Sequence, residues 1–561
     1  MTSFRPRLFD AIKGYRSGTF AADLGAGVTV GLVALPLAMA FGIASGVKPD
    51  SGIFTAIIAG FIISALGGSR VQIGGPAGAF VVIIYGIILQ YGLANLLIAT
   101  MMAGVLLFAM GLTGVGSLIR FIPIAIVIGF TNGIAVLIAL SQVKEALGLE
   151  IEKMPADFIS QIQVINENIG TVNEFSIIIV VASLILLFLW PRLASHAGRF
   201  GMAGLPGSAA LIGRVPGTIV VLVLATLATQ FLHLPVETIG SRFGGIPQGF
   251  PPFLLPAFSW HSVRHLVAPA ITIALLGAIE SLLSARVADR MINDRHDPNQ
   301  ELMAQGIANF LTPLFGGIPA TGTIARTTTN IRTGAQTPIA GIIHSVTLLV
   351  IVLVAAPLAS YIPMAALAAI LLFVAWNMGE WHEFRRLSKF ALEYRVKMLA
   401  TFLLTVIVDL TVAVEVGLVL ASLSFIYRMS DLTRIEPIDL SQNAESFLPG
   451  EHRIVAYKMT GTLFFGTVGK IESLLDQNRD RTLVVVLEMH QVINLDATGL
   501  DALKTLLNTL KTEGCSLVLS GPTAQPLELI QRTGFIDELG VANVLTNLEV
   551  ALVRARDLAS K

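Results

Sequence analysis

Long apolar runs, separated by short polar stretches, follow one another from about residue 21 to about residue 430. Most of them approach the ~20 residues that a helix needs to cross a bilayer. By the hydropathy rule the pattern predicts about fourteen membrane-spanning helices. Their expected ranges are 21–46, 53–67, 76–91, 94–115, 118–143, 175–190, 215–232, 265–288, 302–315, 322–333, 338–357, 362–378, 396–410 and 412–428.

Two of these runs, 76–91 and 322–333, are too short to cross a membrane alone, and each follows a break rich in Gly and Pro. The second run also carries Arg326 and several Thr residues, so it must line a cavity or lie inside protein. Paired interrupted segments at corresponding positions of two halves indicate the midplane binding site of a transporter built from inverted repeats. Re-entrant turns with a packing role only are the alternative.

The pattern predicts two structural parts, an α-helical polytopic membrane region and a small α/β domain. With seven spans in each half, the second half would be inverted relative to the first. After Arg434 the hydropathy falls, and strands are expected at 454–459, 483–487 and 516–520, with helices at 468–475, 500–510 and 528–533. The expected division is an N-terminus (1–20), a transport domain (21–434, repeats about 21–232 and 265–430), a linker (435–452) and the α/β domain (453–561).

Composition supports a membrane protein and gives no sign of a nucleic-acid partner. Hydrophobic residues make up 54% of the chain and charged residues 13%, against about 25% charged in soluble domains. The formal net charge is zero, so nothing points to nucleic acid. Basic residues gather after the even-numbered spans, for example at 286–295 and 385–397. The positive-inside rule then predicts a cytoplasmic (inner) membrane protein, contacting lipid, with both termini in the cytoplasm.

One carboxylate, Glu280, lies in the middle of the apolar run 265–288. A charge at this depth costs several kcal/mol and is rarely kept without a task or a partner. Ser284 stands at i+4, on the same helix face. We expect this pair to bind the coupling ion, a proton, because protonation would neutralise the carboxyl group. The alternative is a structural carboxylate hydrogen-bonded to Ser284 or to an amide of the next span, such as Gln305 or Asn309.

The two breaks carry the candidate substrate site. Two half-helix N-termini that converge on one point offer free N–H groups and positive dipole ends to an anion. Arg326, about one turn into its helix, is predicted to complete a clamp on the anion. An arginine that reaches to the membrane interface is the alternative. The expected substrate-binding residues are Gly75, Pro76, Ala77, Gly78, Thr321, Gly322, Thr323, Ala325 and Arg326.

Enzyme chemistry is not indicated. The chain has no nucleotide-binding loop, no H-E-x-x-H sequence and no Cys/His cluster, and Cys515 is its only cysteine. The histidines, His344 included, are interpreted as loop or helix-end residues. No metal and no organic cofactor are expected. A channel, a motor-like or structural role and a nucleobase carrier are the competing interpretations within membrane proteins.

Four motifs carry a resemblance to a known family. They are Ala34–Gly42, Gly277–Leu283, Gly316–Thr327 and Asn494–Leu500. With them the chain resembles, over essentially its whole length, the SulP anion transporters with a C-terminal STAS domain. The resemblance implies two inverted seven-helix repeats, core and gate domains in an elevator-like motion, and a homodimer. It also implies that Phe41 lies against the anion, and that spans one and eight close the site.

The resemblance is strongest to bacterial C4-dicarboxylate carriers of the family, which have the same sequence around Glu280. Bicarbonate carriers have Asp at that position and use it to bind Na⁺, so glutamate implies proton coupling. The resulting expectation is proton-coupled symport of dicarboxylates. Sulfate or bicarbonate transport, coupled to protons or Na⁺, and an anion channel or exchanger are the alternatives.

The resemblance also extends to the STAS domain. In related anti-sigma antagonists the loop before the first long helix carries a phosphorylated Ser or Thr, which corresponds to Thr498 here. The residues themselves favour Thr498 as a helix N-cap. The domain is expected to regulate transport, to aid dimer assembly or to bind a cytoplasmic protein partner.

Overall fold

The computed structural model describes residues 4–117, 123–199, 215–256, 260–408, 410–440, 453–473 and 482–560. Within these ranges the chain divides into two compact units, Met1–Leu418 and Val419–Lys561. The division falls inside helix α20 (Leu410–Leu432).

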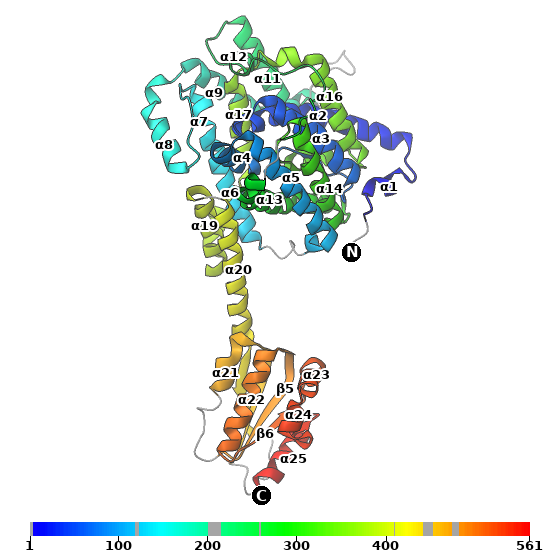
Figure 1. Cartoon of the computed structure of the whole chain (residues 1–561), viewed down its shortest axis with the longest axis vertical. Coiled ribbons are helices and arrows are strands. Elements are labelled where there is room, and N and C mark those ends of the chain that lie inside the picture. Colours follow the sequence, from blue (N-terminus) through cyan, green and yellow to red (C-terminus); the bar gives the residue numbers. More distant parts are fainter. Residues whose placement is uncertain are drawn as a thin grey trace. The chain divides into compact units, whose positions relative to one another are not determined.

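Each range predicted as a span contains a helix (Figure 1). In the first half these are α2 (Ser17–Ala44), α3 (Pro49–Leu66), α4 (Gly78–Tyr91), α5 (Leu93–Thr113), α6 (Ile124–Ser141), α9 (Glu174–Arg199) and α11 (Gly217–Phe231). In the second half they are α13 (Trp260–Ile292), α14 (Pro298–Leu311), α15 (Ile324–Arg332), α16 (Ile339–Ala359), α17 (Met364–Met378), α19 (Leu392–Ile407) and α20. Short helices α1 (Arg7–Ile12), α7 (Val143–Leu147), α8 (Phe158–Glu167), α12 (Ile239–Phe243) and α18 (Trp381–Arg386) complete this unit.

Length and composition explain why these helices suit a membrane. Eight of the described helices are long and apolar enough to cross a bilayer, and α4 and α11 are shorter apolar helices. The helix α15 is the exception, since it has only 9 residues and carries Arg326, Thr327 and Asn330, all buried. It is therefore enclosed by protein, as its polarity requires.

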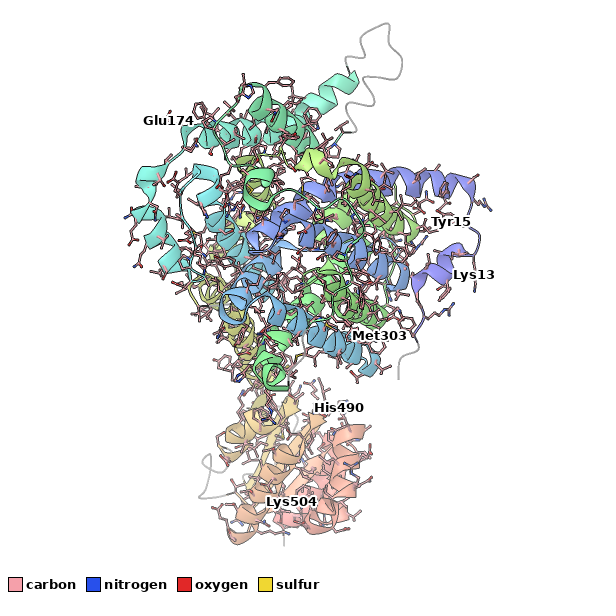
Figure 2. All side chains as sticks on the ribbon, turned by 45° about the horizontal axis from the view of Figure 1, so that its top comes forward. Lys13, Tyr15, Glu174, Met303, His490 and Lys504 are labelled. Carbon is pink, nitrogen blue, oxygen red and sulfur yellow. The ribbon has the colours of Figure 1, made fainter. Side chains whose placement is uncertain are left out.

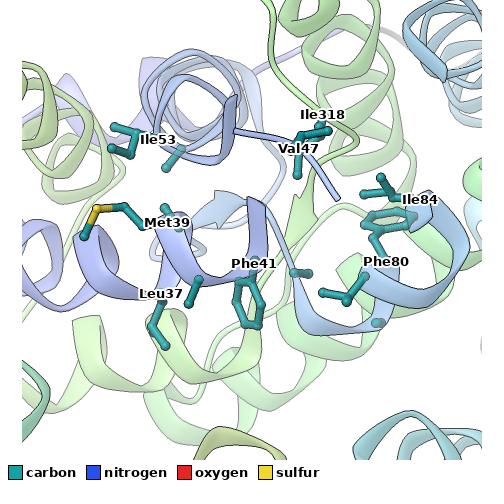
Figure 3. Close-up of a cluster of buried hydrophobic side chains, with 14 of the residues drawn as sticks. Leu37, Met39, Phe41, Val47, Ile53, Phe80, Ile84 and Ile318 are labelled. Atoms are coloured by element: carbon teal, nitrogen blue, oxygen red, sulfur yellow. The ribbon is translucent and has the colours of Figure 1, made fainter. Parts of the chain in front are cut away.

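Helices of the two halves pack against each other through small residues. The helices α14 and α5 are neighbours, and α16 packs on α2 and α3. Gly104 and Gly306 face one another so closely that a Cβ on either would lie 2.7 Å from the other's carbonyl oxygen. Such contacts let helix backbones approach where lipid provides no hydrophobic driving force. Around the crossing of the halves, Phe41, Phe80, Ile84 and Ile318 share one apolar cluster (Figure 3).

Two extended segments cross at the centre of the first unit. Strand β1 (Gly74–Gly75) pairs antiparallel with β2 (Thr321–Gly322), with Gly74 opposite Gly322. The breaks predicted from the sequence thus lie side by side. The helix α4 begins just after β1 and α15 just after β2.

The second unit is built on a five-stranded sheet in the order β3-β4-β5-β6-β7. Its strands are β3 (Arg434–Pro437), β4 (Ile454–Leu463), β5 (Val484–Leu495), β6 (Ser516–Ser520) and β7 (Val544–Leu545), and its helices are α21 (Val468–Glu472), α22 (Ala497–Thr512), α23 (Ala524–Arg532), α24 (Phe535–Leu539) and α25 (Leu548–Ala559). The strand β3 pairs antiparallel with β4, whereas the other pairs are parallel. Charged side chains such as Lys504, which reaches Glu538, stand on its surface (Figure 2).

The sequence predicted β4, β5, β6, α21, α22 and α23 but missed the rest of this unit. The stretch 435–452, expected to be a linker, begins within strand β3, and its residues 441–452 lie outside the described part of the chain. The strand β3 is short and its residues are mostly exposed. It therefore lacks the buried apolar run by which a strand is recognised.

The end of α20 is joined to the sheet by a cluster of polar bonds. The Lys470 Nζ donates to the Ser430 carbonyl at 2.6 Å and to the Thr433 carbonyl at 2.7 Å. The Ser430 hydroxyl donates to the Gly466 carbonyl, and the Thr433 hydroxyl to the Thr462 carbonyl. A lysine on the last carbonyls of a helix satisfies groups that have no partner within the helix and favours the negative end of its dipole.

Lys470→Met should loosen this joint and leave the rest of the unit folded. Hydrogen bonds to a charged group contribute roughly 1.5–3 kcal/mol each when lost from a protected site. We expect hydrogen exchange at residues 430–437 to accelerate by about tenfold or more. Lys511→Met is the matched control, because Lys511 donates to Glu538 far from the joint. Unchanged exchange at 430–437 would contradict a fastening role for Lys470.

Candidate anion-binding site

The N-termini of α4 and α15 meet at the strand crossing with their backbone donors uncapped. The N-cap residues are Ala77 and Thr323, and in this fully described part of the chain neither helix has a side-chain cap. Thr323 could cap, but its hydroxyl donates to the Ile73 carbonyl at 3.2 Å instead. The first N–H groups of both helices therefore remain available, and each carries the positive end of a helix dipole. This arrangement can bind an anion without a fixed cation.

The predicted residues lie at this point in the described structure. Gly75 and Pro76 lead into α4, Gly78 is its first residue, and Ala325 lies in the first turn of α15. Because the helix begins at Gly78, Pro76 precedes the N-cap and lies outside the first turn. All of the residues expected on the α4 side are buried.

Phe41 lies at the first turn of α4. Its side chain is 6% exposed, and a Cβ placed on Gly78 would approach the ring to 3.3 Å. The close-up in Figure 3 shows Phe41 in the same cluster as Phe80 of α4. The structure thus brings together the aromatic ring and the helix N-terminus that the sequence places more than thirty positions apart.

Buried polar side chains hold the crossing in place. The Thr321 hydroxyl donates to the Gly277 carbonyl of α13 at 2.9 Å. Asn309 of α14 holds Ala320 through two bonds of 2.8 Å, one to its N–H and one to its carbonyl. The hydroxyl of Thr327 accepts from the Ile73 N–H at 3.0 Å. These bonds tie β1 and β2 to α13, α14 and α15.

Gly322 is constrained by the side chain of Gln72. The Gln72 amide donates to the Ser281 hydroxyl at 3.0 Å and to its carbonyl at 3.2 Å, and it passes directly over Gly322. A Cβ on Gly322 would lie 1.5 Å from the Gln72 Nε2. Only glycine fits here unless Gln72 moves, and Gln72 is buried and bonded.

Gly322→Ala should therefore lower both stability and transport. Overpacking a buried site costs about 1–3 kcal/mol, and loss of the Gln72 bonds adds to this. We expect a lower melting temperature and a loss of most uptake. Gly86→Ala is the matched control, because a Cβ at this α4 glycine meets nothing within 4 Å. Combining Gly322→Ala with Gln72→Ala should recover stability in part, and a double variant no better than the single one would contradict the steric explanation.

Glu280 belongs to α13, the helix that contacts β2. It lies one turn after Gly277, whose carbonyl binds Thr321. The side chain is partly accessible, but its Oε2 is buried and has no hydrogen-bond partner among the described residues. No hydrogen bond among the described residues therefore holds this oxygen in place. A buried carboxylate oxygen without a donor raises the free energy of the folded state, so a purely structural role does not explain it.

The partners that the sequence suggested for Glu280 bind elsewhere. The Ser284 hydroxyl donates to the Thr327 hydroxyl of α15 at 3.3 Å, so the structural alternative of a Ser284–Glu280 hydrogen bond is wrong. A part for Ser284 in binding the coupling ion stays a prediction. The Gln305 amide bonds to Glu301 and the Asn309 amide to Ala320. Ser284 stabilises the α13–α15 contact instead. Among the described residues, the Glu280 Oε2 and both Arg326 Nη atoms lack partners, so these atoms do not pair with one another.

Glu301 is a second buried carboxylate, which the sequence analysis missed. It is fully buried at the start of α14 and accepts from the Gly68 N–H at 2.9 Å, the Ser69 N–H at 3.2 Å and the Gln305 amide at 3.1 Å. Its position in the first turn of a helix, with Gln at i+4, could have indicated this role. Because its oxygens are satisfied, Glu301 is structural.

Arg326 points into the protein. The side chain is 1% exposed, so the alternative of an arginine reaching for the membrane interface is wrong. Both Nη atoms lack a hydrogen-bond partner in the described structure. A Cβ on Gly75 would lie 2.3 Å from Nη1, which places the guanidinium directly against β1. Its positive charge therefore adds to the field of the two helix N-termini.

A separate cavity of about 150 Å³ lies further along α4. It is lined by Tyr85, by the ends of α2 and α6 and by the segment with Glu152, Lys153, Met154 and Ala156. The Tyr85 hydroxyl donates to the Met154 carbonyl at 2.6 Å and so joins α4 to this segment. Charged groups on its wall include Lys144 and the ion pair of Arg242 with Glu145.

In the second unit, Asp496 and not Thr498 caps α22. The Asp496 carboxylate accepts from the Gly499 N–H at 2.8 Å. Thr498 is exposed in the first turn of α22. The N-cap predicted from the sequence therefore belongs two residues earlier, and the Thr498 hydroxyl is not used for capping.

Comparison with known proteins identifies both parts of the chain. Residues 20–401 match the Sulfate permease family and residues 448–551 match the STAS domain. YvdB of Bacillus subtilis (strain 168), whose name assigns sulfate transport provisionally, is 42% identical over 95% of this chain and 97% of its own. The bicarbonate transporter BicA of Synechocystis sp. (strain ATCC 27184 / PCC 6803 / Kazusa) is 30% identical over 92% of this chain and 91% of its own.

Solved structures show the same fold. The overall structure of SLC26A9 superimposes with a TM-score of 0.84 at 18% identity, covering 99% of this chain and 93% of that one. The transmembrane domain of a cyanobacterial BicA gives a TM-score of 0.62 at 28% identity, covering 73% of this chain and 98% of that one. The relatives are transporters rather than enzymes.

Proposed function

The chain belongs to the sulfate permease family of anion transporters and carries a C-terminal STAS domain, and from this premise we propose that it is a secondary active transporter of a small oxyanion. Sulfate and bicarbonate are its leading substrates. The observation that carries the proposal is the pair of uncapped helix N-termini, α4 and α15, that meet at the antiparallel crossing of β1 and β2. Free backbone donors at two dipole ends favour an anion of any shape that fits between them.

Dicarboxylates, the substrates first expected, have weaker support. The two relatives described above are named for sulfate and for bicarbonate, and neither is named for a dicarboxylate. The side chains at the crossing also offer little to a second carboxylate. The hydroxyls of Thr321 and Thr323 are already bonded to backbone carbonyls, and the guanidinium of Arg326 is enclosed. A compact oxyanion needs only the backbone donors and the nearby positive charge.

For the transport cycle we propose symport with protons, with Glu280 as the coupling residue and Na⁺ as the alternative ion. An unpaired buried carboxyl oxygen, one helical turn after the Gly277 carbonyl that binds Thr321, supports this role. An elevator-like motion would carry the crossing across the cytoplasmic membrane. A homodimer, both termini in the cytoplasm and a regulatory or partner-binding STAS domain complete the proposal. The exposed Thr498 is its candidate modification site.

Uptake into proteoliposomes tests the substrate and the coupling ion together. Labelled sulfate, bicarbonate and a C4-dicarboxylate would be compared with and without imposed pH and Na⁺ gradients. We expect accumulation of sulfate or bicarbonate when the outside is more acidic, competed by the other anion. Accumulation of the dicarboxylate alone would identify dicarboxylates as the substrates, as the sequence predicted. Strict dependence on Na⁺ would reassign Glu280 to cation binding. The absence of flux for all three anions would overturn the proposal.

A further inference from the structure

His344 is a buried group that the anion site does not yet explain. The sequence suggested a loop or helix-end residue, but His344 lies within α16 and is fully buried. Neither ring nitrogen has a hydrogen-bond partner among the described residues. A buried polar group without a partner costs about 1–3 kcal/mol. Packing alone does not explain a buried imidazole without hydrogen bonds, because an apolar side chain would fill the same space without this cost.

The ring lies next to the anion site, on the side of α3. A Cβ on Gly60 of α3 would lie 3.4 Å from the His344 Cε1 and 3.2 Å from the Gly74 carbonyl oxygen. Arg326 approaches the next residue, Gly75, because a Cβ on Gly75 would lie 2.3 Å from the Arg326 Nη1. The same Cβ would lie 3.5 Å from the Cα of Ala56, so Gly75 is also beside α3. The imidazole and the guanidinium thus approach the same two-residue strand, β1.

Arg326 is the charge that acts on His344 within the described structure. The helices packed against α16 are α2 and α3. The one acidic residue of α2, Asp23, is bonded to Thr337 and Gln336 before α16 begins, and that of α3, Asp50, lies in its first turn. Arg332, the other charged residue of α15, is exposed in its last turn. The Gly341 carbonyl, one turn earlier in α16, favours a proton on the ring, but among the described residues no carboxylate offsets the charge of Arg326 there.

A bound anion lowers the electrostatic cost of protonating His344 near Arg326. An anion at the N-termini of α4 and α15 sits beside β1 and offsets the charge of Arg326. The number of protons needed to offset the bound anion depends on the charge of that anion. Relative to the empty protein, a monovalent anion adds one negative charge, which the proton on Glu280 offsets, whereas a divalent anion adds two. The buried Glu301 stays bonded to the Gly68 and Ser69 N–H groups and does not enter this difference. One proton on His344 offsets the second negative charge, and only a divalent anion requires it. Neutrality matters because a net charge within the membrane is costly.

We propose that His344 takes up a proton from solution when a divalent oxyanion such as sulfate binds at the crossing. This inference rests on the proposed function. His344 is a positioning residue, because it acts on the anion through Arg326 and β1. The proton adds to a ring nitrogen and leaves again with the anion. By linkage, the same coupling makes sulfate bind more tightly as the pH falls.

Calorimetry on the purified full-length protein tests the inference. Sulfate binding in buffers of different ionisation enthalpy gives the number of protons taken up. We expect the wild type to take up about one proton more per sulfate than His344→Gln, and the pH dependence of its affinity to be steeper by up to about tenfold per pH unit. His490→Gln, an exposed histidine of the STAS domain labelled in Figure 2, is the matched control and should behave as wild type.

The wild type alone supplies a second readout that needs no variant. It should take up about one proton more with sulfate than with bicarbonate, by the charge count above. Equal proton uptake for the two anions, or His344→Gln with the wild-type proton count, would overturn the role of His344. Sulfate binding at pH 8 by His344→Gln would show that the anion site itself is intact. No binding of either anion by the wild type would overturn the proposed function and this inference with it.

Discussion

Glu280→Gln should abolish the accumulation of substrate driven by a pH gradient while leaving substrate binding intact. In the empty protein, an ionised Glu280 offsets the charge of Arg326, so the core can return across the membrane neutral. Glutamine mimics the protonated form and leaves the empty core with the net charge of Arg326. Moving such a charge through the membrane is strongly disfavoured. The loaded protein remains neutral, so counterflow exchange should persist.

The measurement is uptake of labelled sulfate and bicarbonate into proteoliposomes with an acidic exterior, beside counterflow under equal pH. We expect net accumulation to fall to the background of empty liposomes and exchange to stay within a few-fold of wild type. Glu174→Gln, an exposed carboxylate in the first turn of α9, is the matched control (Figure 2). Full accumulation by Glu280→Gln would show that Glu280 does not couple transport to protons. Loss of both exchange and accumulation would indicate that Glu280 has a structural role.

Arg326→Met should weaken anion binding by about tenfold to a hundredfold. This estimate takes the loss of one charge-assisted interaction as roughly 1.5–3 kcal/mol. Because the guanidinium is buried without a partner, its removal also relieves a desolvation cost. The variant should therefore be at least as stable as wild type without substrate. It should gain less thermal stability than wild type when sulfate is added.

Half-saturation concentrations for uptake and sulfate-dependent melting temperatures measure both effects. Arg332→Met changes an exposed arginine of the same helix. Its half-saturation concentration and its sulfate-dependent melting temperature should both match those of the wild type. An unchanged half-saturation concentration in Arg326→Met would remove Arg326 from the site. A variant that melts well below wild type without sulfate would show that the guanidinium is structural, contrary to its lack of partners.

The sequence by itself determined the elements of the membrane unit. A helix that crosses lipid must be long and apolar, and this requirement is local, so runs such as 21–46 and 338–357 were found as α2 and α16. The same holds for the two interrupted segments, because several Gly and Pro residues cluster in each break, whereas a single Pro such as Pro36 is tolerated inside α2. The buried strands β5 and β6 were visible for the same reason, since each is a continuous apolar run.

Only the tertiary structure decided which polar groups meet. Ser284 lies on the predicted helix but bonds to Thr327, and Gln72 bonds to Ser281, more than two hundred positions away. Glu301 is satisfied by the backbone of Gly68 and Ser69, while Arg326 and His344 are left unpaired beside β1. Hydrogen bonding is directional and short in range, so the partner of a polar group depends on how distant helices pack. Periodicity along the chain records which face is apolar, but not which donor an acceptor finds across a helix interface.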